Sequence, residues 1–165
     1  MLILGVDPGI AIVGYGLIRY ENNRFTPVDY GAIETKSTTP TVDRLIQVHE
    51  GLYEIVEKYH PDVAAIEELF FQHNQTTIIN VAQARGALLM ALARHQVPIF
   101  EYTPMQVKQA VTGYGRAEKA QIQAMMRMLL GLPAVPKPDD VADALAIAIC
   151  HANSHKNLQS FRKGI

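Results

Sequence analysis

The chain is poor in several features that define whole classes of protein. It has a single cysteine, Cys150, among 165 residues. One cysteine excludes internal disulfides and a cysteine-rich zinc site, and favours a reducing compartment. No uninterrupted apolar run reaches the length of a membrane span, and the N-terminus lacks the basic start of a signal peptide. These absences predict a soluble, cytoplasmic protein with no membrane partner.

The chain also lacks a strong charge of either sign. Its formal net charge is −1, whereas many nucleic-acid-binding domains are strongly basic. Any contact with nucleic acid would therefore need a local basic face. A length of 165 residues, 48% of them hydrophobic, suits one ordinary domain with a sizeable core and is short for two.

The first stretch, Leu2 to Asp7, is an apolar run that is too short for a helix and ends in a carboxylate. Pro8 and Gly9 follow it and indicate a sharp turn. The pattern predicts a buried strand with Asp7 at its carboxyl end, where open α/β sheets place their ligand sites. Asp is also common in turns for its own hydrogen bonds, so this segment alone leaves a purely structural role equally open.

The rest of the chain alternates between strand-like and helix-like segments. Further strands are expected at residues 12–20, 25–35, 62–67 and 97–102. Helices are expected at residues 41–60, 76–95, 105–111, 117–130 and from about 139. The first three strands follow one another through short turns and are predicted to be antiparallel. The later alternation of strand and helix predicts parallel strands.

The C-terminal region is expected to change character after His151. The composition turns polar there, which predicts a loosely ordered tail from Asn153 onward. His151 and His155 have helical spacing and lie near Cys150, a combination that could mimic a metal site. We interpret them as a surface helix end, because no strong zinc spacing is present.

Acidic residues stand at three positions of this pattern. Glu67 ends an apolar run of the same design as the first one, and Asp139, Asp140 and Asp143 open the last helix. Residues three or four apart share one face of a helix, so Asp143 can face the same way as Asp140 or Asp139. Asp143 lies among small apolar residues, where an acid needs a partner. We expect Asp139 to cap the helix.

Four carboxylates without basic partners nearby in sequence would repel one another unless they shared cations. Hard oxygen ligands favour Mg²⁺ or Mn²⁺. Two such ions, roughly 3.5–4 Å apart, can activate a water and steady the leaving oxygen of an in-line displacement. The acids therefore indicate phosphoryl chemistry, although scattered acids are ordinary in a chain of this size.

Five motifs together carry a family resemblance. They are GVDPG at 5–9, AIEELFF at 65–71, QARGALL at 83–89, FEYTPMQVKQAVTGYGRAEK at 100–119 and DDVADALAIAI at 139–149. With the order of strands and helices, the chain resembles the RuvC-type Holliday-junction resolvases of the ribonuclease H-like superfamily over nearly its whole length. The long motif at 100–119 is much more specific than any single acid.

The resemblance implies a fold, an activity and partners. The fold is an α/β, ribonuclease H-like, five-stranded mixed sheet flanked by helices on both faces. It would form a single nuclease domain over residues 1–155, with a polar tail over 156–165. The activity is paired, symmetric incision of four-way DNA junctions, dependent on two Mg²⁺ ions or on Mn²⁺, in recombination and repair. The partners are a second copy of the chain and the RuvA and RuvB branch-migration proteins. Independently of the resemblance, the apolar faces of the helix at 76–95 make it a candidate dimer seam.

The resemblance also assigns residues. The acids that match the family's catalytic, metal-binding positions are Asp7, Glu67, Asp140 and Asp143. Phe70 matches an aromatic residue that meets unpaired bases, and Lys108 and Lys119 match DNA-contacting lysines. Adjacent strand residues face opposite sides, so only one of Glu67 and Glu68 can join Asp7, and the family's AIE motif selects Glu67. Some family members carry His at the Asp140 position.

A local basic segment supports DNA binding independently of the family. Between residues 103 and 127, Lys108, Arg116, Lys119 and Arg127 outnumber the single acid Glu118. Such a segment supplies the positive surface that the total charge lacks. A solvated helix surface is the alternative interpretation.

Three other functions remain open from the sequence. Asp7, Pro8 and Gly9, with Gly14 and Gly16, could form the phosphate loop of an actin-like ATPase, but such proteins need a second lobe for which this chain has no room. A ribonuclease H that cuts RNA–DNA hybrids is a second alternative. A junction-binding scaffold without catalysis is a third, and acids at all four positions argue against it.

Overall fold

A computed structural model describes residues 1–69 and 75–162, with side chains described for residues 1–69 and 78–155. The strands are β1 (Leu2–Asp7), β2 (Ile12–Glu21), β3 (Arg24–Glu34), β4 (Val63–Glu67) and β5 (Ile99–Tyr102). The helices are α1 (Thr41–Tyr59), α2 (Gln75–Arg94), α3 (Pro104–Thr112), α4 (Lys119–Leu129) and α5 (Asp139–Arg162). The predicted elements are thus confirmed in type and order, with small differences at their ends.

The strands form one five-stranded mixed sheet in the order β3-β2-β1-β4-β5. β1 pairs antiparallel with β2, and β2 pairs antiparallel with β3. On its other side β1 pairs parallel with β4, which in turn pairs parallel with β5. The predicted antiparallel first half and parallel second half are therefore confirmed.

β1 occupies the centre of the sheet, and its alternating side chains enter two different cores. Ile3 packs into one apolar cluster with α5, whereas Leu4 and Val6 pack into the other with α1 and α2. Because both faces are covered, every residue from Leu2 to Val6 is buried. Asp7 is the last residue of the strand, as predicted. It lies at the edge of the sheet that the carboxyl ends of β1, β4 and β5 form.

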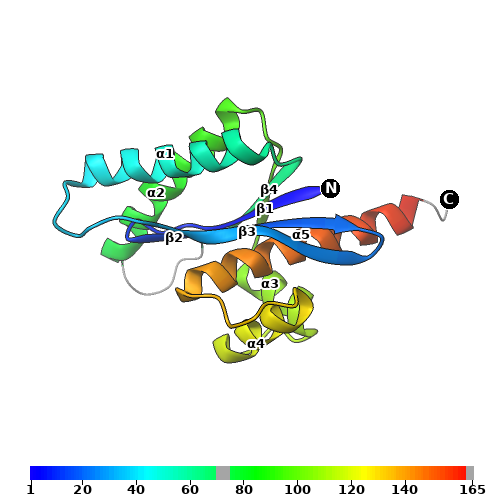
Figure 1. Cartoon of the computed structure of the whole chain (residues 1–165). Coiled ribbons are helices and arrows are strands. Elements are labelled where there is room, and N and C mark those ends of the chain that lie inside the picture. The colour runs from blue at the N-terminus through cyan, green and yellow to red at the C-terminus, as the bar shows by residue number, and fades with distance from the viewer. Residues whose placement is uncertain (70–74, 163–165) are drawn as a thin grey trace.

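Helices cover both faces of the sheet, which confirms the expected layered architecture. Figure 1 shows α1 and α2 together on one side of the sheet and α3, α4 and α5 on the other. α5 crosses β1 and β2 and contacts both α3 and α4. The helix that carries Asp140 and Asp143 therefore packs directly on the strand that carries Asp7.

Glycines in the sheet allow α5 to approach the strands closely. A Cβ added at Gly14 would overlap the carbonyl oxygen of Asp140, and one at Gly5 would overlap that of Ala144. Gly14 is also the register partner of Asp7 on β2. The absence of a side chain at Gly14 thus brings the first turn of α5 beside the end of β1.

Two expectations about the C-terminal region were wrong. α5 continues to Arg162, so the segment predicted to be loosely ordered from Asn153 onward is helical that far. Asn153 Nδ2 donates to the Ala110 carbonyl at 3.1 Å, which ties this polar turn to α3. His151 is buried with 3% exposure rather than lying at a surface helix end. Its Nδ1 lies 2.8 Å from the Tyr102 hydroxyl, a partner from a distant strand that sequence spacing does not reveal.

None of the helices within the described ranges combines the length and apolar character needed to cross a membrane.

Candidate active site

The predicted acids gather at one edge of the sheet. Asp7 ends β1 and Glu67 ends β4, and because these neighbouring strands are parallel, both residues stand at the same edge. Asp140 and Asp143 lie in the first turns of α5. The pKa of Asp7 is raised well above its ordinary value by burial, and further by the negative charges of Glu67, Asp143 and Asp140. All four acids are therefore close enough to interact electrostatically.

Glu67 and Asp143 show the same crowding. Burial raises the pKa of Glu67 to about 7, with a further contribution from Asp143, while Lys108 and Lys119 act in the opposite direction. Burial also raises the pKa of Asp143, and Lys119 opposes that shift. The edge of the sheet therefore holds more negative charge than the two lysines balance.

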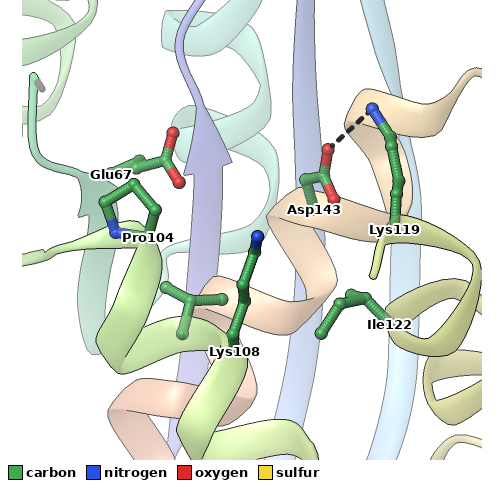
Figure 2. A pocket seen from close by; sticks show the side chains of 7 residues that line it. Glu67, Pro104, Lys108, Lys119, Ile122 and Asp143 are labelled. Carbon is green, nitrogen blue, oxygen red and sulfur yellow. Dashed lines mark ion pairs between the residues drawn. The ribbon is translucent and has the colours of Figure 1, made fainter. Parts of the chain in front are cut away.

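A small cavity of about 170 Å³ opens between these acids and the helices α3 and α4. Figure 2 shows Glu67 and Asp143 on its two sides, with Lys108 and Lys119 also directed toward it. The remaining lining residues are Pro104, Val107 and Ile122. The cavity thus combines acids that could bind cations with lysines that could bind phosphates.

A capping box begins α3 and fixes the position of Lys108. Gln106 N donates to Thr103 Oγ1 at 3.2 Å, and Thr103 N donates to Gln106 Oε1 at 2.8 Å. Pro104, whose missing N–H costs nothing at a helix start, occupies the first turn. Lys108 lies one turn further along, where it faces the cavity.

Lys119 is the first residue of α4, which follows a second capping box formed by Glu118 and Gln121. The positive end of the helix dipole repels a cation at a helix N-terminus, so acidic partners stabilise a lysine in this position. Lys119 Nζ lies 3.3 Å from Asp143 Oδ2 and 3.6 Å from Asp139 Oδ2. These ion pairs join the start of α4 to the start of α5.

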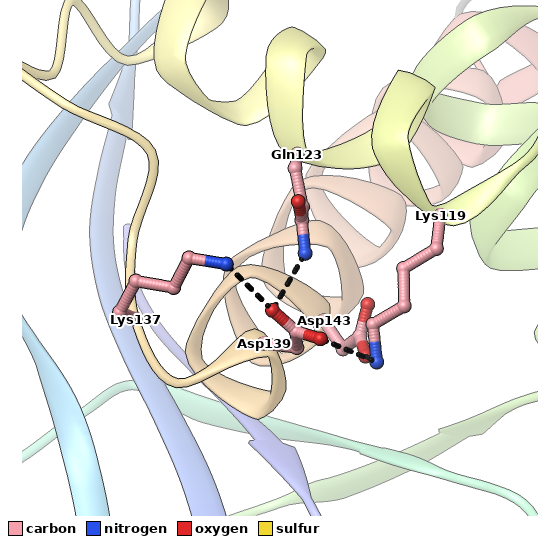
Figure 3. Close-up of polar contacts among 5 residues, drawn as sticks. All are labelled: Lys119, Gln123, Lys137, Asp139 and Asp143. Atoms are coloured by element: carbon pink, nitrogen blue, oxygen red, sulfur yellow. Dashed lines mark hydrogen bonds and ion pairs between the residues drawn. The ribbon is translucent and has the colours of Figure 1, made fainter.

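Asp139 has other partners as well, which Figure 3 shows. Its Oδ1 accepts from Gln123 Nε2 at 2.8 Å and from Lys137 Nζ at 3.1 Å. The hydrogen bond from Lys137 is the main reason that the pKa of Asp139 is lowered. Asp139 was expected to be a helix cap, and its carboxylate instead holds three side chains around the beginning of α5.

The carboxylates do not stand in a coordinating arrangement. Within residues 1–69 and 75–162, no group of three or more His, Cys, Asp or Glu side chains is placed to hold a metal ion. The chemistry of the donors nevertheless fits a hard divalent cation, because the converging groups are carboxylates with raised pKa values. The ammonium of Lys119 supplies the positive charge beside Asp143.

The four residues that were predicted to contact DNA do not all line the cavity. Lys108 and Lys119 line the cavity. Arg116 is exposed in the loop before α4 and does not contribute to the cavity lining. Phe70 lies outside the described residues. The pairing of Lys119 with Asp139 and Asp143 was missed, because no sequence spacing links the starts of two different helices.

Comparison with known proteins identifies the family of this chain. The family model for crossover junction endodeoxyribonuclease RuvC matches residues 3–151. The chain belongs to the RuvC family. The match covers all of β1 except Leu2, the whole of the other four strands and each of the four acids.

Individual RuvC relatives match the chain over nearly its full length. The crossover junction endodeoxyribonuclease RuvC of Alkaliphilus metalliredigens is 58% identical over 93% of this chain and 94% of its own. That of Caldanaerobacter subterraneus is 50% identical over 99% of both chains. Thermus thermophilus RuvC in complex with a Holliday junction substrate superposes with a TM-score of 0.90 at 35% identity, over 94% of this chain and 95% of that one. The yeast mitochondrial resolvase Ydc2 shares the fold, with a TM-score of 0.69 at 15% identity over 98% of this chain and 83% of its own.

Proposed function

We propose that this protein is an endodeoxyribonuclease that resolves four-way DNA junctions by paired, symmetric incisions. The observation that carries the proposal is the gathering of Asp7, Glu67 and Asp143 at one edge of the sheet, beside a cavity lined by Lys108 and Lys119. Membership of the RuvC family supports the substrate, since a Thermus thermophilus relative has been solved with a Holliday junction. The cellular role would be recombination and repair of DNA in the cytoplasm.

The four acids would hold two Mg²⁺ ions, with Mn²⁺ able to substitute. Such ions supply Lewis acidity, which activates a water for in-line attack and stabilises the leaving oxygen. The charges of Glu67, Asp143 and Asp140 all act on Asp7. Asp7 would help to hold both ions, Glu67 one of them, and Asp140 with Asp143 the other. Cleavage in this manner leaves a 5′-phosphate and a 3′-hydroxyl.

The lysines would act on the phosphate backbone. Lys108 and Lys119 both carry their charge at the cavity, where a scissile phosphate would meet the acids. Lys119 would exchange its ion pair with Asp143 for a contact with a DNA phosphate. Arg116 would contact the backbone farther out, and Phe70 would stack on an unpaired base.

A homodimer would supply the two active sites that paired incision requires. Between Ile79 and Met90, the face of α2 that a second copy would cover is exposed and carries no charged residue. Its described members over that stretch are Ile79, Ala82, Gln83, Gly86 and Met90. Ile79 and Met90 are 60% and 64% exposed, so this face offers apolar surface that a partner could cover. A two-fold axis through this α2 face would match the symmetry of a junction cut in strands of like polarity. RuvA and RuvB would deliver the junction to the dimer.

A synthetic mobile junction tests the proposal. With Mg²⁺ we expect paired nicks that DNA ligase can seal, and with a chelator we expect none. Cleavage of an RNA–DNA hybrid in preference to the junction would instead identify a ribonuclease H. ATP turnover without DNA would favour the actin-like alternative, and junction binding without cutting would favour the scaffold.

A further inference from the structure

Arg85 on α2 reaches across to the end of the strand that carries Glu67. Its Nε donates to the backbone carbonyl of Glu67 at 3.3 Å, and its Nη2 lies 2.8 Å from Glu101 Oε2 on β5. The side chain of Arg85 is only 12% exposed, whereas that of Glu101 is 50% exposed. One buried guanidinium therefore contacts the carboxyl-terminal ends of two neighbouring strands.

The contact lies where the sheet's own hydrogen bonding ends. The β1–β4 register stops at Val6 and Ile66, one residue before Glu67. The β4–β5 register stops at Glu67 itself, which pairs with Tyr102. At this position strand pairing alone constrains the backbone less than it does in the middle of β4. The bond from Arg85 adds a constraint from a helix on the face of the sheet.

Stability alone does not account for this side chain. Burying a guanidinium is costly, and an apolar side chain of similar volume is often as stabilising. Nη2 is fully buried and, although close to Glu101, makes no well-aligned hydrogen bond within the described structure. The guanidinium contacts the backbone of Glu67 and leaves the carboxylate free for other partners.

We propose that Arg85 is a positioning residue, which fixes the Glu67 backbone and so presets the Glu67 carboxylate for binding a divalent cation. This inference rests on the proposed function. A guanidinium suits the role because its donors form a rigid fork that can hold a carbonyl and a carboxylate at once. A lysine in its place would keep the charge but lose that fork.

The test compares Arg85→Gln and Arg85→Lys with wild type, using Arg94→Gln as the matched control. Arg94 ends the same helix, and its guanidinium lies over the Tyr53 ring, far from Glu67 in the fold. Two quantities are measured: Mn²⁺ affinity by calorimetry without DNA, and the single-turnover cutting rate of a prebound junction in Mg²⁺. Because Arg85 would act as an outer-shell partner, we expect both Arg85 variants to lose about 10–100-fold in each.

Two further readouts separate positioning from folding. Junction affinity in chelator should be unchanged in the Arg85 variants, because Arg85 does not itself line the cavity and contacts only the backbone of Glu67 there. Amide exchange should quicken at Glu68, whose N–H donates to the Tyr102 carbonyl at 2.9 Å, and not across the rest of the sheet. Arg94→Gln should match wild type in Mn²⁺ affinity, cutting rate and exchange.

The outcomes distinguish this inference from the proposed function. A wild-type protein that does not cut junctions would refute the proposed function. A cutting wild type, together with Arg85→Gln or Arg85→Lys that equal it in Mn²⁺ affinity and rate, would overturn the inference alone. The inference would also be overturned if the Arg85 variants had lower thermal stability but cut at the wild-type rate per folded molecule. If the Arg85 variants do not fold, Glu101→Gln loosens the same guanidinium, and unchanged Mn²⁺ affinity in that variant would overturn the inference.

Discussion

Lys119 Nζ lies 3.3 Å from Asp143 Oδ2, so a cation of the protein itself stands inside the acidic cluster. Burial raises the pKa of Asp143, and the charge of Lys119 works against that shift. The ammonium thus offsets part of the repulsion among acids that four converging carboxylates create. Under the proposed function, Lys119 must leave its ion pair with Asp143 and pair with a DNA phosphate instead.

Removing Lys119 should therefore weaken DNA binding through charge. We expect Lys119→Ala to bind a four-way junction less tightly and to reduce the slope of log affinity against log salt concentration by about one. Binding in chelator at several salt concentrations measures that slope. Lys58→Ala is the control, because Lys58 lies in the last turn of α1, which precedes the opposite end of β4. Equal slopes for Lys119→Ala and wild type would count against a phosphate contact.

The raised pKa of Glu67 predicts a pH dependence of stability. Its pKa is about 7 in the folded protein, against an ordinary value of 4.5, so the folded state holds the proton more tightly than the unfolded chain. In the metal-free protein, this carboxyl should therefore lower the free energy of unfolding progressively as the pH rises from about 4.5 to about 7. Above about pH 7 the full loss should be present.

Glu67→Gln should remove this contribution. The variant should gain stability over wild type at about pH 8 and much less at about pH 5, and urea unfolding midpoints in chelator measure the difference. Mg²⁺ should restore much of the lost stability of wild type at the higher pH and have little effect on the variant. A difference between the two proteins that does not vary with pH would contradict the burial of an ionisable Glu67.

The exposed face of α2 predicts a dimer that a single charge can disrupt. Met90→Glu should shift the protein toward monomer, because a buried unpaired carboxylate at the seam is costly. Sedimentation velocity measures the change. Met128→Glu is the matched control, since Met128 on α4 is 68% exposed, close to the 64% of Met90. Equal dimer content in both variants would place the interface elsewhere.

Local sequence patterns predicted the strands and the acids at their ends. The apolar runs predict buried strands that end in carboxylates at Asp7 and Glu67, and β1 and β4 end at these residues. Strand alternation also predicted that only one of Glu67 and Glu68 joins Asp7. Glu67, which the family motif selects, lines the cavity, whereas Glu68 is exposed. These predictions succeeded because each depends on periodicity within a few residues.

Contacts between distant elements were not predictable in the same way. His151 is buried beside Tyr102 from β5, and the polar composition of this part of α5 gave no sign of that contact. The contact of Arg85 with the Glu67 carbonyl joins α2 to β4, although its motif was noted in the sequence. In each case the deciding partner is far away in the chain, so spacing carries no signal.

The role of Asp7 is tested most directly by Asp7→Asn, which keeps the shape of the side chain and removes its charge. A mobile junction in Mg²⁺ is scored for paired, ligatable nicks, and binding is measured in chelator. Asp62→Asn is the control, because Asp62 precedes β4 at the opposite edge of the sheet and accepts from Leu2 N at 2.6 Å. We predict no cutting by Asp7→Asn, with junction binding as tight as wild type or tighter, and normal cutting by the control. Cutting by Asp7→Asn at the wild-type rate would contradict a catalytic role for the acidic edge of the sheet.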